Sequence, residues 1–82
     1  MLLYFEFEER RVKADVTWPK GKGSISVHVT DPDLARDLPT DLLFDVGANN
    51  KVHYTIEDRD NKRLIELQDV IARRLQEFVN KS

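Results

Sequence analysis

The chain contains no cysteine among its 82 residues. A disulfide framework and thiolate ligation of a metal are therefore excluded. The stability of so small a domain must come from the burial of apolar side chains or from association with another chain. A chain without cysteine also fits a reducing compartment, so a cytoplasmic location is expected.

A long apolar run is also missing, because no segment approaches the roughly 20 apolar residues of a membrane-spanning helix. The apolar start at residues 1–5 is interrupted at Glu6. No basic region precedes it, so this start predicts a strand and not a signal peptide. The length predicts one domain over residues 1–82. Without a spanning segment or a clustered basic face, no membrane association is expected.

Basic residues are not in excess, since 13 Lys and Arg stand against 15 Asp and Glu and the formal net charge is −2. A nucleic-acid binder normally presents a clustered basic face, so a nucleic-acid partner is disfavoured. Acidic residues gather in the connection from Asp31 to Asp45, which includes Asp37 and Asp41. Such carboxylates usually act as caps and solubilising charge. A docking face for a basic partner is the alternative.

Apolar and polar residues alternate in five runs, which is the pattern of half-buried strands. The runs cover residues 3–8, 11–18, 24–30, 42–46 and 51–57. The first two runs predict a hairpin that turns at residues 9–10 and places Phe7 opposite Val12. The next hairpin places Val16 opposite Ile25, although a register shifted by two residues would preserve the same inward faces.

A short helical turn is predicted between the third and fourth runs. Asp31 is a candidate N-cap and Pro32 suits the first helical position. Leu34 and Leu38 are four residues apart, so they would lie on one side of this turn and form a short cover for the sheet.

A longer helix is predicted over residues 60–81, where the apolar residues recur with helical period and the charged residues take the opposite side. Gln68 alone interrupts the apolar arc. It is expected to bond a backbone group at a strand end or to lie at a wet margin of the core.

These elements predict an α+β fold, with a five-stranded, mostly antiparallel sheet and one C-terminal amphipathic helix packed on one face. The strand order does not follow from the pattern. A five-stranded sheet is roughly 24 Å wide, whereas a helix with its side chains is about 10–12 Å across. The remaining apolar strip must be closed by the Leu34 and Leu38 turn, by curvature of the sheet, by a second copy or by another partner.

No constellation of residues points to catalysis, so the chain is expected not to be an enzyme. His28, His53 and Asp45 could form a metal-like set if their strands were adjacent. Without close ligand spacing, two solvated histidines are the better interpretation, and neither a metal nor a cofactor is expected. A hydrolytic triad with Ser24, Ser26 or Thr55 has less support, because nothing marks a nucleophile turn or an oxyanion hole.

The breaker cluster at residues 18–23 resembles, in composition only, a basic hairpin tip beside an aromatic side chain. Trp18 could stack on a base while Lys20 and Lys22 meet phosphate. Together with Arg10, Arg11 and Lys13, these residues define an alternative function, a nucleic-acid-binding module. An inward Trp18 that closes one end of the core is the more ordinary interpretation.

The favoured prediction is a small non-catalytic protein-interaction domain. Its partner would be another protein or a second copy, bound through the part of the sheet that the helix leaves uncovered. The candidate binding residues are Trp18, Lys20, Lys22, Leu34, Leu38, Asp37, Asp41 and Gln68.

Overall fold

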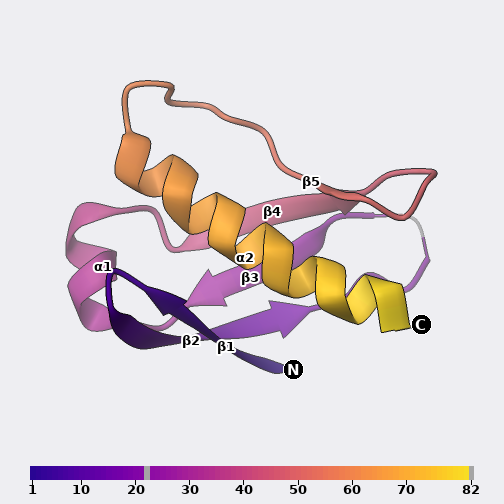
Figure 1. Cartoon of the computed structure of the whole chain (residues 1–82), viewed down its shortest axis with the longest axis horizontal. Coiled ribbons are helices and arrows are strands. Elements are labelled where there is room, and N and C mark those ends of the chain that lie inside the picture. The colour runs from indigo at the N-terminus through magenta and orange to yellow at the C-terminus, as the bar shows by residue number, and fades with distance from the viewer. Residues whose placement is uncertain (22, 82) are drawn as a thin grey trace.

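The computed structural model describes residues 1–21 and 23–81. It has the predicted α+β fold, an antiparallel sheet with one long helix lying across one face (Figure 1). The elements in chain order are β1 (Leu2–Phe7), β2 (Arg10–Thr17), β3 (Ile25–Val29), α1 (Pro32–Asp37), β4 (Asp41–Val46), β5 (Val52–His53) and α2 (Lys62–Lys81).

The sheet is a meander in which each strand pairs antiparallel with the next one in the chain, in the order β1-β2-β3-β4-β5. Residues of β3 and β4 pair across the connection that contains α1, with Ile25 opposite Phe44. The two edges of the sheet are therefore β1 and β5.

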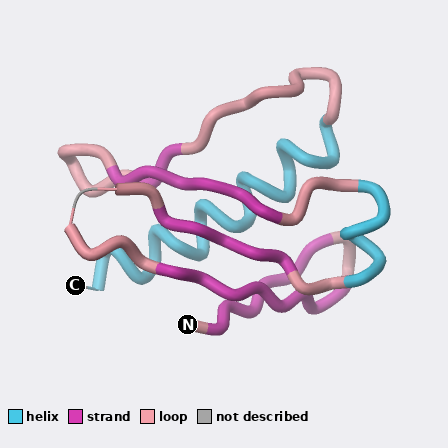
Figure 2. Tube along the Cα trace, turned by 180° about the vertical axis from the view of Figure 1, so that it is seen from behind, coloured by secondary structure: helices cyan, strands magenta, loops and turns pink. Residues whose placement is uncertain are grey.

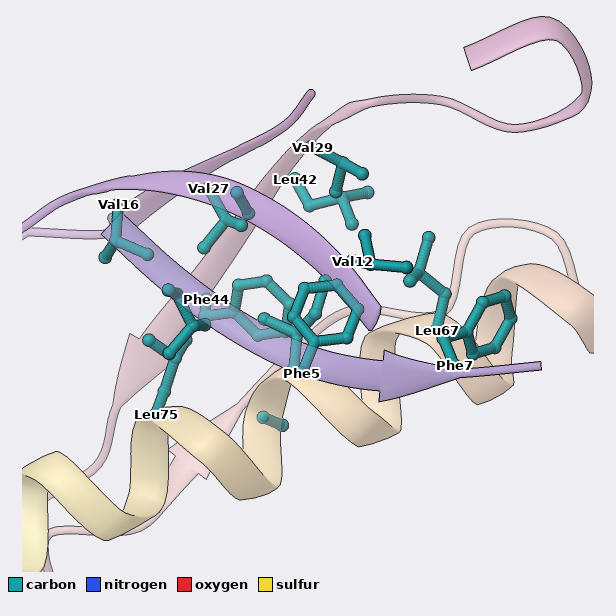
Figure 3. Close-up of a cluster of buried hydrophobic side chains, with 14 of the residues drawn as sticks. Phe5, Phe7, Val12, Val16, Val27, Val29, Leu42, Phe44, Leu67 and Leu75 are labelled. Atoms are coloured by element: carbon teal, nitrogen blue, oxygen red, sulfur yellow. The ribbon is translucent and has the colours of Figure 1, made fainter. Parts of the chain in front are cut away.

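The core lies between the sheet and α2 (Figure 3). The inward residues of β1 to β4 that the alternation predicts are buried, with the exception of Val46 at the end of β4. From α2 the buried residues are Leu64, Leu67, Gln68, Ile71, Ala72 and Leu75. Alternation and helical period thus identified most of the core correctly.

The predicted register of the first hairpin is wrong by two residues. Phe5, and not Phe7, lies opposite Val12. The turn consists of Glu8 and Glu9, whose φ angles are 53° and 62°. Two positive φ angles are what a two-residue turn of type I′ requires. A shift of two residues keeps the same side chains inward, so the alternation alone could not distinguish the two registers.

The register between β2 and β3 differs from the prediction in the same way, since Val16 lies opposite Val27 and not opposite Ile25. Trp18 consequently lies beyond the end of β2, where it is half-buried and packs against the core.

The last strand is much shorter than predicted, because only Val52 and His53 pair with β4. Within this short pairing, Asp45 lies opposite His53. Ile56, expected to face inward, is exposed. Figure 2 shows the chain leaving the sheet after this short pairing and arching over to the start of α2.

Both helices have side-chain caps at their N-termini. Asp31 accepts bonds from the backbone N–H groups of Asp33 and Leu34, as predicted for this residue. Asn61 accepts a bond from Leu64 N–H at 3.1 Å and caps α2. None of the described helices combines the length and the apolar character that crossing a bilayer would require.

Curvature resolves the mismatch between sheet and helix widths. The backbone of α2 approaches β1 and β5 more closely than the central strands, so the sheet curls around the helix. Leu34 and Leu38 are buried and close the end of the core beside α1. The inward residues of β1 to β3 are all buried, so their part of the core face leaves no apolar strip for a second copy to cover.

Candidate functional site

The β5 edge of the sheet is covered by side chains of α2. Gly47 N–H donates to the Lys51 carbonyl at 2.8 Å, so the alternation of an antiparallel pair turns the backbone of Val52 away from β4. Gln76 meets this edge as a neighbouring strand would. Its Oε1 accepts from Val52 N–H at 2.8 Å, and its Nε2 donates to the Asn50 carbonyl at 2.7 Å.

The β1 edge is open by comparison. Met1 and Val16 exchange two hydrogen bonds, at 2.9 and 2.7 Å. Because such pairs alternate along an antiparallel ladder, the backbone groups of Leu2, Tyr4 and Glu6 point away from β2. Within residues 1–21 and 23–81, the one hydrogen bond to these outward groups joins Arg74 Nε to the Tyr4 carbonyl at 3.1 Å.

The side chains along β1 do little to protect this edge. Natural proteins guard edge strands with short length, proline, lysine, bulges or a covering element. β1 has six residues, with no proline or lysine. On its outer face Leu2 is 52% exposed and Tyr4 is 42% exposed. Of the outward-facing residues of β1, only Glu6 carries a charge on its side chain.

Two hollows flank the β1 edge. One of about 240 Å³ is apolar and is lined by Met1, Trp18, Phe78 and Val79. The other, of about 360 Å³, is lined by Tyr4, Phe5, Glu6, Arg11 and Arg74. In this second hollow the Arg11 guanidinium lies 4.9 Å from the centre of the Tyr4 ring, which is cation–π distance. The edge therefore offers an apolar position and a position of mixed charge beside its outward backbone groups.

The turn that ends β1 is held by Arg63 at the start of α2. The Arg63 guanidinium donates to the Glu8 carboxylate at 2.7–3.0 Å and to Asp37 at 3.0 Å. The hydrogen bond from Arg63 holds the pKa of Glu8 below its ordinary value of 4.5. This contact ties the β1–β2 turn to α1 and α2 and fixes one end of the open edge.

We predict that Glu8 makes the fold sensitive to acid. The folded-state pKa of Glu8 is lowered, so its stabilisation is present above about pH 4.5 and is lost as the pH falls through the folded-state value. Glu8→Gln should therefore flatten the fall of the melting temperature between about pH 5 and pH 3, measured by circular dichroism. Glu9→Gln is the matched control, because Glu9 lies in the same turn and no described residue pairs with it. Equal pH profiles for the two variants would contradict this role of Arg63.

The structure distributes the predicted binding residues over several surfaces. Trp18 lies beside a cleft of about 800 Å³ between the β2–β3 loop and the β4–β5 loop. Lys20 is exposed in the β2–β3 loop, and Lys22 is outside the described residues. Leu34 and Leu38 are buried in the core, so they serve the fold.

Three polar residues of that set have partners within the chain, namely Asp37, Asp41 and Gln68. Asp37 pairs with Arg63, and an Asp41 oxygen lies 2.7 Å from His28 Nδ1. Gln68 is buried, and its Nε2 donates to the Thr55 carbonyl at 3.3 Å. This bond to the backbone just beyond β5 is the structural role expected for Gln68.

Among the described basic residues of the nucleic-acid alternative, Arg10 lies apart from Arg11 and Lys13. Arg10 is paired with Asp31 at 3.1 Å and with Asp33 at 3.3 Å, beside α1. Arg11 and Lys13 lie on the outer face of the sheet, next to acidic neighbours. No observation therefore favours this alternative.

The residues considered for catalysis or metal binding are not arranged as a hydrolytic triad or as a metal site. Ser24, Asp45 and His53 lie in one row across the outer face, with Asp45 in the middle. Ser24 Oγ donates to Asp45 at 2.7 Å, so the hydroxyl meets a carboxylate and not an imidazole that could act as a base. His28 pairs with Asp41 in another row. Throughout the described parts of the chain, no three potential ligands converge as a metal site would require.

No family model, curated protein or solved structure matches the chain. The function therefore rests on the geometry of the chain itself. Sequence reasoning missed the β1 edge, Arg74 and Gln76. The available signal was a six-residue apolar strand without lysine or proline, but its position at an edge depends on the strand order.

Proposed function

We propose that this chain is a non-catalytic protein-interaction domain that accepts an extended segment of another polypeptide along β1. The observation that carries the proposal is the contrast between the two edges. α2 satisfies the outward backbone of β5 through Gln76. Among residues 1–21 and 23–81, the outward backbone of β1 has a single partner, Arg74, which bonds to the Tyr4 carbonyl.

Strand addition uses the two features that the β1 edge provides. Backbone hydrogen bonds supply affinity, and hollows for alternate side chains supply selectivity. The apolar hollow beside Met1 and Phe78 suits an aliphatic or aromatic side chain. The hollow with Tyr4, Glu6, Arg11 and Arg74 presents both charge signs and an aromatic ring, so it suits a side chain with a polar end or with aliphatic groups. The preferred segment is therefore extended, with apolar and amphipathic side chains on its interacting side.

We predict that Tyr4→Pro abolishes this interaction and leaves the domain folded. The Tyr4 N–H points away from β2, so proline removes an outward donor without removing a bond of the β1–β2 ladder. Random peptides displayed on phage would be selected against the wild-type chain and then measured against the variant by titration. We expect a loss of binding of at least about tenfold, which corresponds to 1.4 kcal/mol.

Tyr4→Ala is the matched control, because it removes the same ring but keeps both backbone groups. Selected peptides should retain most of their affinity for Tyr4→Ala. They should also slow amide exchange at Leu2 and Glu6 in the wild-type chain. Peptides that bind Tyr4→Pro as tightly as the wild type, or that leave those amides unprotected, would show that the β1 edge is not the binding site.

A further inference from the structure

We propose that the segment bound by β1 is the β1 strand of a second copy of this chain, paired antiparallel about a two-fold axis at Tyr4. This inference rests on the proposed function, because it names the partner for the same edge. This edge-to-edge pairing differs from an association through the core face of β1 to β3. The inward residues of that face are already buried within the chain.

The register follows from which residues offer outward backbone groups. An axis at Tyr4 pairs Tyr4 with Tyr4 of the second copy and Leu2 with Glu6 of the second copy. All three outward residues are then used, for about six backbone hydrogen bonds. An axis at Leu3 leaves Glu6 unpaired, and an axis at Glu6 places two carboxylates opposite each other, which is destabilising.

An axis at Phe5 is also less favourable. It would pair Leu2 with Glu8 of the second copy. Glu8 lies in the turn with φ 53° and is bonded to Arg63, so it cannot continue an extended strand. The axis at Tyr4 is thus the one symmetric register that satisfies the edge without a charge conflict.

The side chains of this register are compatible on the outer face. The two Tyr4 rings would meet at the axis, and aromatic pairs across strands are stabilising. Each ring already carries the guanidinium of Arg11, 4.9 Å from its centre. Leu2 would lie beside the methylene groups of Glu6 of the second copy, which covers an exposed leucine and leaves the carboxylate in water.

The charges on α2 are self-complementary about the same axis. Arg74 bonds to the Tyr4 carbonyl at 3.1 Å and to the carboxylate of Glu77. Because Arg74 is bonded to Tyr4, a two-fold axis at Tyr4 brings the Arg74 and Glu77 pairs of the two copies close to each other. Each arginine can then bond to a glutamate of either copy. A carbonyl oxygen has two acceptor positions, so the bond from Arg74 leaves room for Tyr4 N–H of the second copy.

Disulfide trapping tests the register directly, because the chain has no cysteine of its own. In a hydrogen-bonded antiparallel pair the Cα atoms are about 5.5 Å apart, which lies within the range that a disulfide spans. We expect Tyr4→Cys to form a covalent dimer under mild oxidation. A mixture of Leu2→Cys and Glu6→Cys should give the mixed dimer.

Glu6→Cys alone is the matched control on the same strand and the same face. Its Cα would be about 13 Å or more from its counterpart, since four residues of strand separate the paired positions. It should form no covalent dimer under the same oxidation. Cross-linking of Glu6→Cys as fast as Tyr4→Cys would overturn the register.

A measurement on the wild-type chain covers the case in which a cysteine variant does not fold. Amide exchange at Leu2, Tyr4 and Glu6 should slow as the protein concentration rises from micromolar to millimolar. Unchanged exchange together with a constant monomer mass in sedimentation would overturn the dimer. Peptides that still bind the wild type and fail to bind Tyr4→Pro would then leave the proposed function standing.

Discussion

Phe44→Ala is expected to lower the free energy of unfolding by about 3–5 kcal/mol, which is a large part of the stability of so small a domain. Phe44 is fully buried in β4. Its ring meets Tyr54 edge to face, with centroids 6.0 Å apart. Alanine would leave a cavity between sheet and helix that neither can fill without moving. A domain of this size has on the order of 4–12 kcal/mol of total stability.

The neighbouring residue provides the control for this prediction. Leu43 is 61% exposed on the outer face of the same strand. Leu43→Ala should change stability by less than about 0.5 kcal/mol. Urea denaturation followed by circular dichroism and by the fluorescence of Trp18 measures both variants. Similar urea midpoints for the two variants would mean that burial of Phe44 does not stabilise the core as expected.

Gln76→Leu is expected to cost about 1–3 kcal/mol and to make the chain prone to association through β5. The variant leaves Val52 N–H and the Asn50 carbonyl without the partners that Gln76 provides at 2.8 and 2.7 Å. Leucine has nearly the same size and a good helix propensity, so α2 itself should persist. The loss would thus report on the covered edge and not on the helix.

Gln76→Glu separates the two bonds. A carboxylate still accepts from Val52 N–H but has no donor for the Asn50 carbonyl. We expect slow amide exchange at Val52 in Gln76→Glu and fast exchange in Gln76→Leu, measured by hydrogen exchange. If Val52 exchanges equally fast in the wild type and in Gln76→Leu, the β5 edge is not covered by Gln76 in solution.

The alternation of residue types was sufficient to predict the sheet, the helix and most of the core. It was not sufficient for the registers, because a shift of two residues preserves every inward side chain. In the observed turn at Glu8 and Glu9, the Glu8 carboxylate is bonded to Arg63, a residue far along the chain. Such a contact has no local signature.

The length of β5 could not be predicted from the alternation of residue types either. Residues 51–57 alternate as a strand would, yet only Val52 and His53 pair with β4. The chain must leave the sheet early to reach the start of α2, and Gln68 holds the departing backbone at Thr55. This is a tertiary constraint that overrides local β propensity.

The candidate interaction edge could not be predicted because it depends on strand order. Every strand has backbone N–H and C=O groups that point to its two sides in the plane of the sheet. Which of these groups remain unpaired depends on the order of the strands. The alternation places Tyr4 on the outer face of a strand, but only the strand order makes β1 an edge and leaves Leu2 and Tyr4 exposed beside it.

The meander also has a kinetic consequence. Each strand pairs with its successor in the chain, so the sheet can grow by closing short loops. The longest closures belong to α2, whose Arg63 meets Glu8 across 55 residues and whose Arg74 meets Tyr4 across 70. Local pairing forms quickly and distant pairing slowly, so we expect docking of the helix to be the late step of folding. Changes at these two arginines should therefore accelerate unfolding more than they slow folding.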